Sequence, residues 1–102
     1  MITEIHKLHE MLVEAGIEHD YYSRNELFGE IDGIDWGWHI VVPFADGAKN
    51  IVSAVEGFGT YGYSDDLIEI MGLLTPEESK YDSVKGWLTA EEVFRRIKEA
   101  LS

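Results

Sequence analysis

The stretch that decides the fold is NIVSAVEGFGTYGYSDDLIEIMGLL, residues 50–74. It opens with a mostly β-branched run at 51–55 and continues into a glycine-rich loop at 57–62. Ser64 is a suitable N-cap for a helix, and Gly72 is a suitable end. Strand, G-x-G-x-x-G and helix in this order is the arrangement that lets backbone amides approach a phosphate. We therefore predict a strand, a loop and a helix from Ser64 to Gly72.

Before this stretch, apolar residues at helical spacing predict a helix that Thr3 caps and that ends at Gly16. Loose alternation predicts a strand over 17–23, and the two glycines and many charges of residues 24–35 predict a loop. Residues 36–44 alternate strictly and form the clearest predicted strand. Asp46-Gly47 is typical of a hairpin, so we expect the strand from residue 51 to pair antiparallel with it.

After this stretch, Thr75 with Pro76 and Glu78 predicts a short helical turn. Thr89 with Glu92 predicts a final helix, which buries Val93, Phe94, Ile97 and Leu101. The predicted order is α-β-β-β-α-α. It corresponds to an α+β fold, a small antiparallel three-stranded sheet with helices packed on one face. A free face or edge of so small a sheet favours a homo-oligomer.

Length and composition limit the class of protein. A chain of 102 residues that is 45% hydrophobic predicts one domain, residues 1–102, with one modest core. The absence of cysteine excludes disulfides and thiolate zinc sites and suits a reducing cytoplasm. The amphipathic start, MITEIHKLHE, does not have the pattern of a signal peptide, and the apolar runs are too short to span a membrane.

The net charge of −12 disfavours nucleic acid and anionic membranes as partners. Two kinds of partner remain, namely a basic or neutral protein, or a small ligand in a pocket whose local field differs from the global one. Acidity that serves only solubility is the simpler alternative.

The glycine-rich loop does not indicate a dinucleotide fold. The chain is too short for two βαβ halves, and the preceding hairpin makes the strand antiparallel. Asp65 and Asp66 would also repel a pyrophosphate from the helix start. A tight turn explains the glycines better than a phosphate cradle does.

Half of the twelve aromatic residues lie in two short segments that also hold six of the ten glycines. Large flat side chains on a glycine-rich backbone suit stacking on a planar ring such as a nucleobase. His39 faces away from the apolar side of its strand and can line a cleft, whereas the strand itself offers Trp36 to the core. The candidate ligand-binding residues are Phe58, Gly59, Thr60, Tyr61, Gly62, Tyr63, His39, Trp36, Arg24 and Lys85.

No conventional catalytic or metal set is visible. His6, His9 and Glu10 read H-x-x-H-E, which is not the order of zincins. The serines have no elbow motif or neighbouring base in sequence, and helix capping explains the paired acids. We therefore expect no metal, no cofactor and no enzymatic activity.

Three segments carry a resemblance to known sequences: Tyr61-Gly62 with 67–75, Asp82 to Phe94 with Arg96-Ile97, and Glu14 to Ile17. They resemble a group of short, acidic, uncharacterised proteins encoded by bacteriophages and prophages of gut Firmicutes. Residues 24–38 have no counterpart there. The resemblance implies a phage accessory protein in the host bacterial cytoplasm, and it transfers no catalytic residue.

Small phage proteins often antagonise host defence, so two functions are expected by analogy. One is a non-enzymatic protein that binds and sequesters a small nucleotide-like ligand and so antagonises bacterial defence signalling. The alternative is an acidic inhibitor that mimics nucleic acid and binds a host defence protein. The motivation for the alternative is the net charge and the six acids between Glu18 and Asp35.

Overall fold

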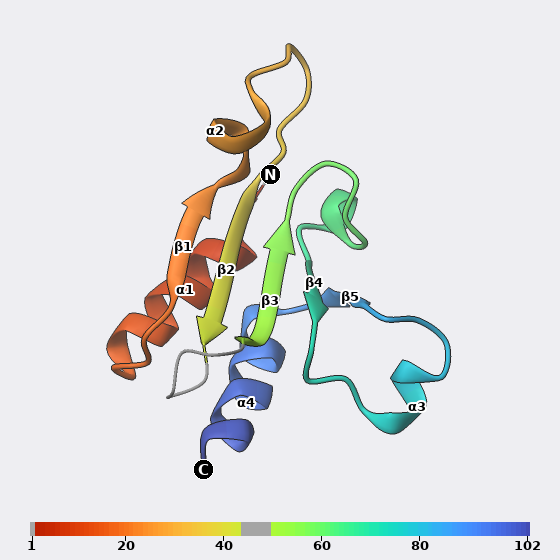
Figure 1. Cartoon of the computed structure of the whole chain (residues 1–102). Coiled ribbons are helices and arrows are strands. Elements are labelled where there is room, and N and C mark those ends of the chain that lie inside the picture. The colour runs from red at the N-terminus through yellow and green to blue at the C-terminus, as the bar shows by residue number, and fades with distance from the viewer. Residues whose placement is uncertain (1, 44–49) are drawn as a thin grey trace.

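The computed structural model describes residues 2–43 and 50–102, which form one antiparallel sheet with helices (Figure 1). The strands are hydrogen-bonded in the order β1-β2-β3-β4-β5, and each pairs antiparallel with the next. In chain order the elements are α1 (Glu4–Glu14), β1 (Asp20–Ser23), α2 (Arg24–Phe28), β2 (Trp38–Pro43), β3 (Asn50–Glu56), the 3-10 turn η1 (Tyr63–Asp65), β4 (Ile68–Met71), α3 (Pro76–Ser79), β5 (Lys85–Leu88) and α4 (Ala90–Leu101).

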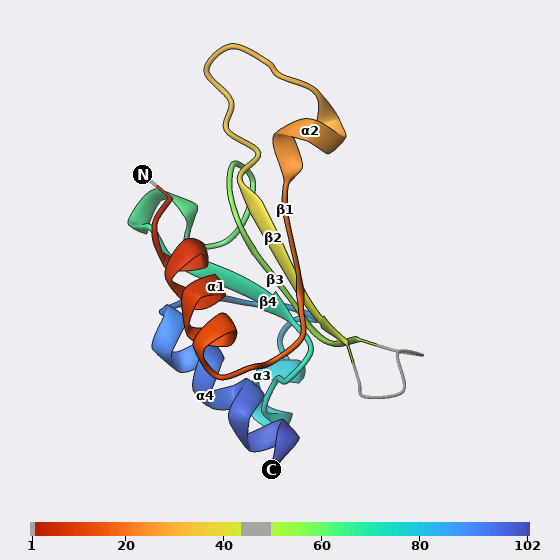
Figure 2. The ribbon, with the colours of Figure 1, turned by 90° about the vertical axis from the view of Figure 1, so that its left-hand side faces the viewer.

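Helices α1 and α4 pack against each other and against the same face of the sheet (Figure 2). Their apolar sides and one face of the strands form the core, whose fully buried large side chains are Ile5, Leu8, Leu12, Ile40, Val42, Val52, Ile68, Ile70, Val93 and Ile97. The opposite face carries His39, Ser53 and Glu69, which are half-buried. Alternation along each strand therefore separates an apolar face from a face with polar groups.

The α+β class is confirmed, but the predicted three-stranded sheet is wrong because the sheet has five strands. The largest error is the helix predicted from Ser64 to Gly72. The chain makes only the short turn η1 there and then strand β4. Ile68 and Ile70 are both fully buried, while Glu69 between them faces the other side of the sheet. This two-residue period is a strand signal, and pairing with β3 outweighs the capping signal at Ser64.

Two further short elements were missed. Strand β5 has four residues and includes Gly86, so it lacks a recognisable apolar alternation. Helix α2 lies within the predicted loop 24–35 and is five residues long, with the Ser23 side chain accepting from the Asn25 amide at its start. Both elements are shorter than the patterns by which sequence reveals strands and helices.

Several predicted boundaries are confirmed. Thr75 forms a capping box with Glu78 at α3, and the Thr89 side chain accepts from the Glu92 amide at α4. Strands β2 and β3 pair antiparallel as expected. The predicted hairpin residues Asp46-Gly47 lie outside the described residues. In the predicted final helix, Val93 and Ile97 are buried but Leu101 is exposed.

Two carboxyl groups from distant parts of the chain hold the first turn of α1. Asp66 accepts hydrogen bonds from the amides of Thr3 and Glu4, at 2.7 and 3.3 Å, and one from the Thr3 hydroxyl. Glu56 Oε1 accepts from the Ile5 amide at 3.0 Å. The Thr3 side chain therefore makes no cap bond of its own, because Asp66 satisfies the amides that a helix start leaves open.

Glu56 is fully buried, and this burial raises its pKa to about 8, with the neighbouring Asp66 carboxylate adding to the rise. Partial burial acts in the same direction on Asp66. The neighbouring Glu56 side chain and the hydrogen bonds from Thr3 and Glu4 outweigh that effect and hold the pKa of Asp66 well below its usual range. At neutral pH the pair therefore carries one proton, which resides on Glu56.

In residues 2–43 and 50–102, none of the helices combines the length and the apolar character needed to cross a bilayer.

The buried carboxyl of Glu56 predicts a loss of stability as the pH rises. Because the pKa of Glu56 in the folded protein lies above its ordinary value of 4.5, the folded state binds this proton more tightly than the unfolded state does. The resulting stabilisation of the folded state is complete below about pH 4.5 and is lost as the pH approaches 8. Glu56→Gln keeps a neutral side chain at every pH. We therefore compare the unfolding free energy of the variant with that of the wild type at two pH values. The advantage of the variant should be roughly 3 kcal/mol larger at pH 8 than at pH 5, because a difference of one in pKa corresponds to about 1.36 kcal/mol. Urea denaturation at both pH values measures this.

Glu30→Gln, at an exposed position, is the matched control and should follow the wild type across the pH range. Parallel pH profiles for wild type and Glu56→Gln would contradict the raised pKa, since they would show that folding leaves the pKa of Glu56 unchanged.

Candidate functional site

The candidate ligand-binding residues do not meet in one pocket of the described chain. Tyr61 and Lys85 line one pocket, and His39 and Arg24 line another. Trp36 lies between Phe28 and Phe58, with ring centroids 5.5 and 5.6 Å away. Phe58, Tyr61 and His39 do not occur together in the lining of any pocket described below.

The glycine-rich loop is a series of tight turns that joins β3 to β4. Thr60 Oγ1 donates to the Gly57 carbonyl at 2.7 Å, and Tyr63 begins η1. Gly59 has a positive φ of 86° in open space, whereas Gly62, with a φ of 101°, is buried. A phosphate cradle at this loop would need a helix after it, and a three-residue turn does not supply one.

The first pocket, which we call the aromatic pocket, has a volume of about 400 Å³ and lies between the end of α3 and strand β5. Three aromatic side chains at its wall are exposed, namely Tyr61, Tyr81 and Trp87. The complete lining is Tyr61, Glu78, Tyr81, Asp82, Val84, Lys85, Gly86 and Trp87. A concave apolar wall with a few polar groups is the usual form of a small-molecule site.

Tyr61 is fixed in this wall by its backbone. Its amide donates to Glu69 Oε1 at 2.9 Å, and its carbonyl accepts from the Trp87 amide at 3.4 Å. Gly86 permits this contact, since a Cβ there would lie 2.3 Å from the Tyr61 Cβ. A Cβ on Gly62 would likewise lie 2.9 Å from the Trp87 nitrogen. These two glycines let the loop and β5 touch along their backbones.

Trp87 is the least expected residue of the pocket. Its backbone has a φ of 57°, in the left-handed region that a bulky residue rarely adopts. Its ring stacks on Tyr61 with centroids 5.5 Å apart and planes 15° apart, and 53% of the side chain is exposed. A strained backbone that presents a large ring to solvent indicates a functional position rather than a core position.

The charges of the aromatic pocket are mixed. Lys85 supplies a cation, while Asp82 and Glu78 supply carboxylates. Glu78 is already bound, because Arg96 donates to both of its oxygens at 2.7 and 2.8 Å. This pairing, with the Thr75 amide, lowers the pKa of Glu78 to about 2. Lys85 is therefore the lining group best suited to meet an anionic or carbonyl group of a ligand.

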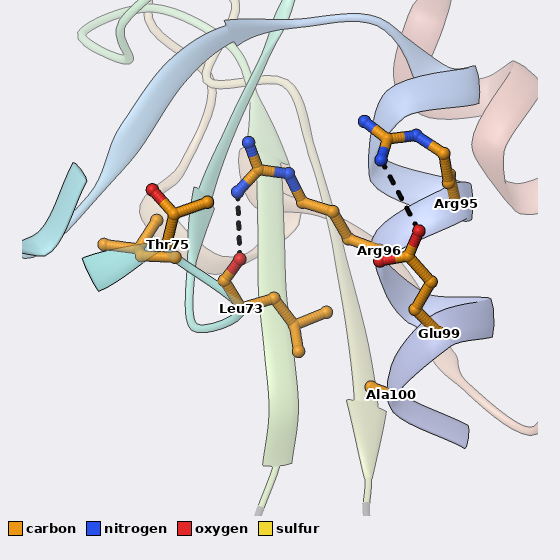
Figure 3. Close-up of a pocket in the computed structure, with 7 residues that line it drawn as sticks. Leu73, Thr75, Arg95, Arg96, Glu99 and Ala100 are labelled. Atoms are coloured by element: carbon orange, nitrogen blue, oxygen red, sulfur yellow. Dashed lines mark hydrogen bonds and ion pairs between the residues drawn. The ribbon is translucent and has the colours of Figure 1, made fainter. Parts of the chain in front are cut away.

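Arg96 also lines a separate groove of about 400 Å³ between α4 and residues 73–75 (Figure 3). Figure 3 shows its guanidinium donating to the Leu73 carbonyl, at 2.9 Å, and Arg95 paired with Glu99 at 3.5 Å. Both arginines are thus engaged with the chain itself. We assign this groove the structural role of fastening the segment before α3 to α4.

The second pocket, which we call the sheet-face pocket, has a volume of about 300 Å³ and lies on the face that α1 and α4 leave uncovered. Its lining is Tyr22, Arg24, Leu27, Phe28, His39, Ser53, Val55, Glu69 and Met71. His39 faces this side, as the alternation predicted. Its Nδ1 is hydrogen-bonded to the Tyr22 hydroxyl and its Nε2 to the Ser53 hydroxyl.

Residues 24–37, which we call the projecting arm, extend beyond the end of the sheet (Figures 1 and 2). Two hydrogen bonds of the Asn25 side chain close the base of the arm. Its amide nitrogen donates to Asp35 Oδ1 at 3.0 Å, and its Oδ1 accepts from the Trp36 amide at 2.9 Å. The arm exposes both apolar and acidic side chains: Leu27, Phe28 and Ile31 with Glu26, Glu30, Asp32 and Asp35.

The histidines of α1 are engaged with aromatic neighbours. His6 is hydrogen-bonded to Tyr21, and His9 Nδ1 lies 2.8 Å from His19 Nε2. Among residues 2–43 and 50–102 there is no group of three or more metal-binding side chains placed to hold an ion.

Sequence reasoning missed Tyr81 and Trp87 for the aromatic pocket and Tyr22 and Ser53 for the sheet-face pocket. The only sequence signal at Trp87 is an aromatic residue that follows a glycine in a segment without apolar periodicity. Comparison of the chain with protein-family models, curated proteins and solved structures finds no match. The pockets are therefore interpreted from their own geometry.

The contact between Gly86 and Tyr61 predicts a strong steric effect. Gly86→Ala places a Cβ against the Tyr61 backbone and side chain, so β5 and the loop must separate. We expect a loss of about 2–4 kcal/mol in unfolding free energy, as for other overpacked or strained sites. Gly59→Ala has open space around it and should cost about 1 kcal/mol through its positive φ alone. Chemical denaturation of both variants compares the two, and equal losses would contradict the close contact.

Proposed function

We propose that this chain holds a planar, nucleotide-like ligand in the aromatic pocket, and that this pocket binds the ligand without catalysing its reaction. The observation that carries the proposal is the half-exposed ring of Trp87, stacked on Tyr61 at the wall of a pocket of about 400 Å³ and held on a left-handed backbone. Exposed, pre-positioned aromatic rings bind flat heterocycles by stacking, with about 1–3 kcal/mol for each base.

The charges of the pocket favour a nucleoside or a monophosphate over a polyphosphate. One cation, Lys85, faces Asp82 and the already paired Glu78. The chain as a whole carries −12, so each further phosphate adds repulsion. The volume suits a base and a ribose. We expect affinity to rise from nucleoside to monophosphate at most slightly and to fall for the triphosphate.

The biological role that fits such binding is sequestration of a nucleotide-like signal, which would antagonise bacterial defence. Its support is the resemblance to short phage and prophage proteins at residues 61–62, 67–75 and 82–94. Those segments include Tyr61, Lys85 and Trp87, but not the lining residues Glu78 and Tyr81. Action in the host bacterial cytoplasm and a homo-oligomeric state belong to the same proposal.

A second candidate function is an acidic inhibitor of a host defence protein, and the projecting arm favours it. The arm combines the exposed apolar residues Leu27, Phe28 and Ile31 with four exposed carboxylates. Apolar anchors within a charged rim are typical of protein interfaces, and the sign of the charge selects a basic partner.

Trp87 provides a test that separates binding from folding. Trp87→Gly removes the ring and places glycine where φ is positive, so we expect the unfolding free energy to change by no more than about 1 kcal/mol. Binding of adenosine and guanosine monophosphates, cyclic nucleotides and ADP-ribose is measured by isothermal titration calorimetry. The variant should bind roughly 10- to 100-fold more weakly than the wild type.

Trp36→Phe is the control, because Trp36 contacts Phe28 and Phe58 and does not line the aromatic pocket. It should keep the affinity of the wild type. The proposal fails if the wild type binds none of these compounds, or if Trp87→Gly binds as well as the wild type does.

The salt dependence of binding to a basic partner tests the role proposed for the projecting arm. The triple variant Glu26→Gln, Glu30→Gln, Asp32→Asn should lose most of the low-salt affinity for a basic partner recovered from bacterial lysate. The triple variant Glu10→Gln, Glu14→Gln, Glu18→Gln has the same net charge but leaves the arm intact, so it should keep the low-salt affinity of the wild type. Binding at 50 and 300 mM salt is compared by surface plasmon resonance, because screening weakens exposed charge pairs. Equal losses in both variants would assign the effect to net charge rather than to the arm.

A further inference from the structure

The sheet-face pocket contains a serine, a histidine and a tyrosine joined by hydrogen bonds. They come from three adjacent strands, Ser53 from β3, His39 from β2 and Tyr22 from β1. The sheet register places Tyr22 opposite His39, and Ser53 opposite Val41, two residues further along β2. All three therefore point to the same face, with His39 in the centre.

Both ring nitrogens of His39 are engaged, Nε2 with the Ser53 hydroxyl and Nδ1 with the Tyr22 hydroxyl. This is the geometry of a nucleophile, a base and a third group that orients the base. Burial, together with the nearby Arg24, lowers the pKa of His39. The imidazole is therefore neutral at pH 7, the form in which it can accept a proton.

The groups that face His39 are those of the pocket wall. Arg24, from α2, is the cation; its Nη1 donates to the Trp36 carbonyl at 3.1 Å and its guanidinium lies 5.2 Å from the centre of the Phe28 ring. Glu69, from β4, is the carboxylate and accepts from the Tyr61 amide. Leu27, Val55 and Met71 supply the apolar part of the wall.

We propose that Ser53 is a nucleophile for acyl transfer, with His39 as its general base and a small carboxylic ester with a short apolar acyl group as substrate. Ser53 Oγ forms a bond to the carbonyl carbon while its proton moves to His39 Nε2. The C–O bond to the leaving alcohol then breaks, and that alcohol takes the proton from the imidazolium. Water repeats the same steps on the acyl-serine and releases the acid, so His39 ends neutral.

Two other residues assist in defined ways. Arg24 lines the same pocket and offers a positive charge to the oxygen that becomes negative during the attack. Tyr22 acts through His39 and is a positioning residue, because its hydroxyl is hydrogen-bonded to Nδ1. The pocket volume of about 300 Å³ limits the substrate to a small ester.

The test uses the full chain and an alkyl fluorophosphonate, which reacts with activated serines by losing fluoride. Intact mass and peptide mapping should show one adduct, on Ser53, in the wild type. Ser53→Ala should carry no adduct, and Ser83→Ala, which changes an exposed serine outside the pocket, should react as the wild type does. His39→Gln should react about 100-fold more slowly. Circular dichroism melts establish that each variant is folded.

The pH dependence separates this chemistry from chance reaction of a hydroxyl group. With p-nitrophenyl acetate, acylation by the wild type should reach a plateau above about pH 6.5, because the His39 pKa lies below that ordinary value. Tyr22→Phe should displace the midpoint of this profile without abolishing the adduct. The proposal is overturned by an unlabelled Ser53, by equal labelling of other serines, by an unchanged rate in His39→Gln, or by a rate that rises tenfold per pH unit without a plateau.

Discussion

The attachment of the segment 56–66 to the start of α1 is the constraint on which the remaining structure depends. Glu56 ends β3 and Asp66 precedes β4, and both accept hydrogen bonds from the first amides of α1. The helix is thereby fixed to the middle of the sheet although 51 residues separate Ile5 from Glu56. Glu4 extends the same connection, since its Oε1 accepts from the Ala90 amide at 2.8 Å and so holds the start of α4. Two helices, and with them the whole covered face, take their position from carboxyl groups that are distant in sequence.

The glycines of the decisive stretch follow from this constraint. A loop attached at both ends to α1 must cross other backbones closely. A Cβ on Gly57 would lie 1.9 Å from the Trp36 carbonyl oxygen, and one on Gly37 would lie 1.8 Å from that of Glu56. Gly62 and Gly86 meet the neighbouring backbone in the same way. Close backbone contact thus explains Gly57 and Gly62, and a positive φ of 86° explains Gly59, so the G-x-G-x-x-G pattern has structural causes and carries by itself no information about phosphate.

The parts of the fold that sequence predicted are those with a local cause. Period-two alternation located β2, and the caps Thr75 and Thr89 located α3 and α4, because each signal depends on neighbours within four residues. Strand β4 was missed because a good N-cap at Ser64 precedes it and only four residues carry its alternation. Strand β5 exists through pairing with β4, and Trp87 adopts its left-handed backbone there against local preference. Such features arise from the sheet as a whole and leave no local pattern.

The candidate sites likewise combine features that have a local cause in sequence with features that arise only from pairing between strands. His39 was placed on the correct face because alternation within one strand is visible in sequence, but its partners Tyr22 and Ser53 lie on other strands. A change of one residue in the β2–β3 register would turn Ser53 to the core face and remove the pair. Tyr61 in turn meets Trp87 only because the loop is held at Glu56 and Asp66 and also at β5. Glu69 connects the two pockets through one hydrogen bond, since it lines the sheet-face pocket and accepts from the amide of Tyr61, whose side chain lines the aromatic pocket. The position of Tyr61 therefore depends on strand β4 as well as on the loop.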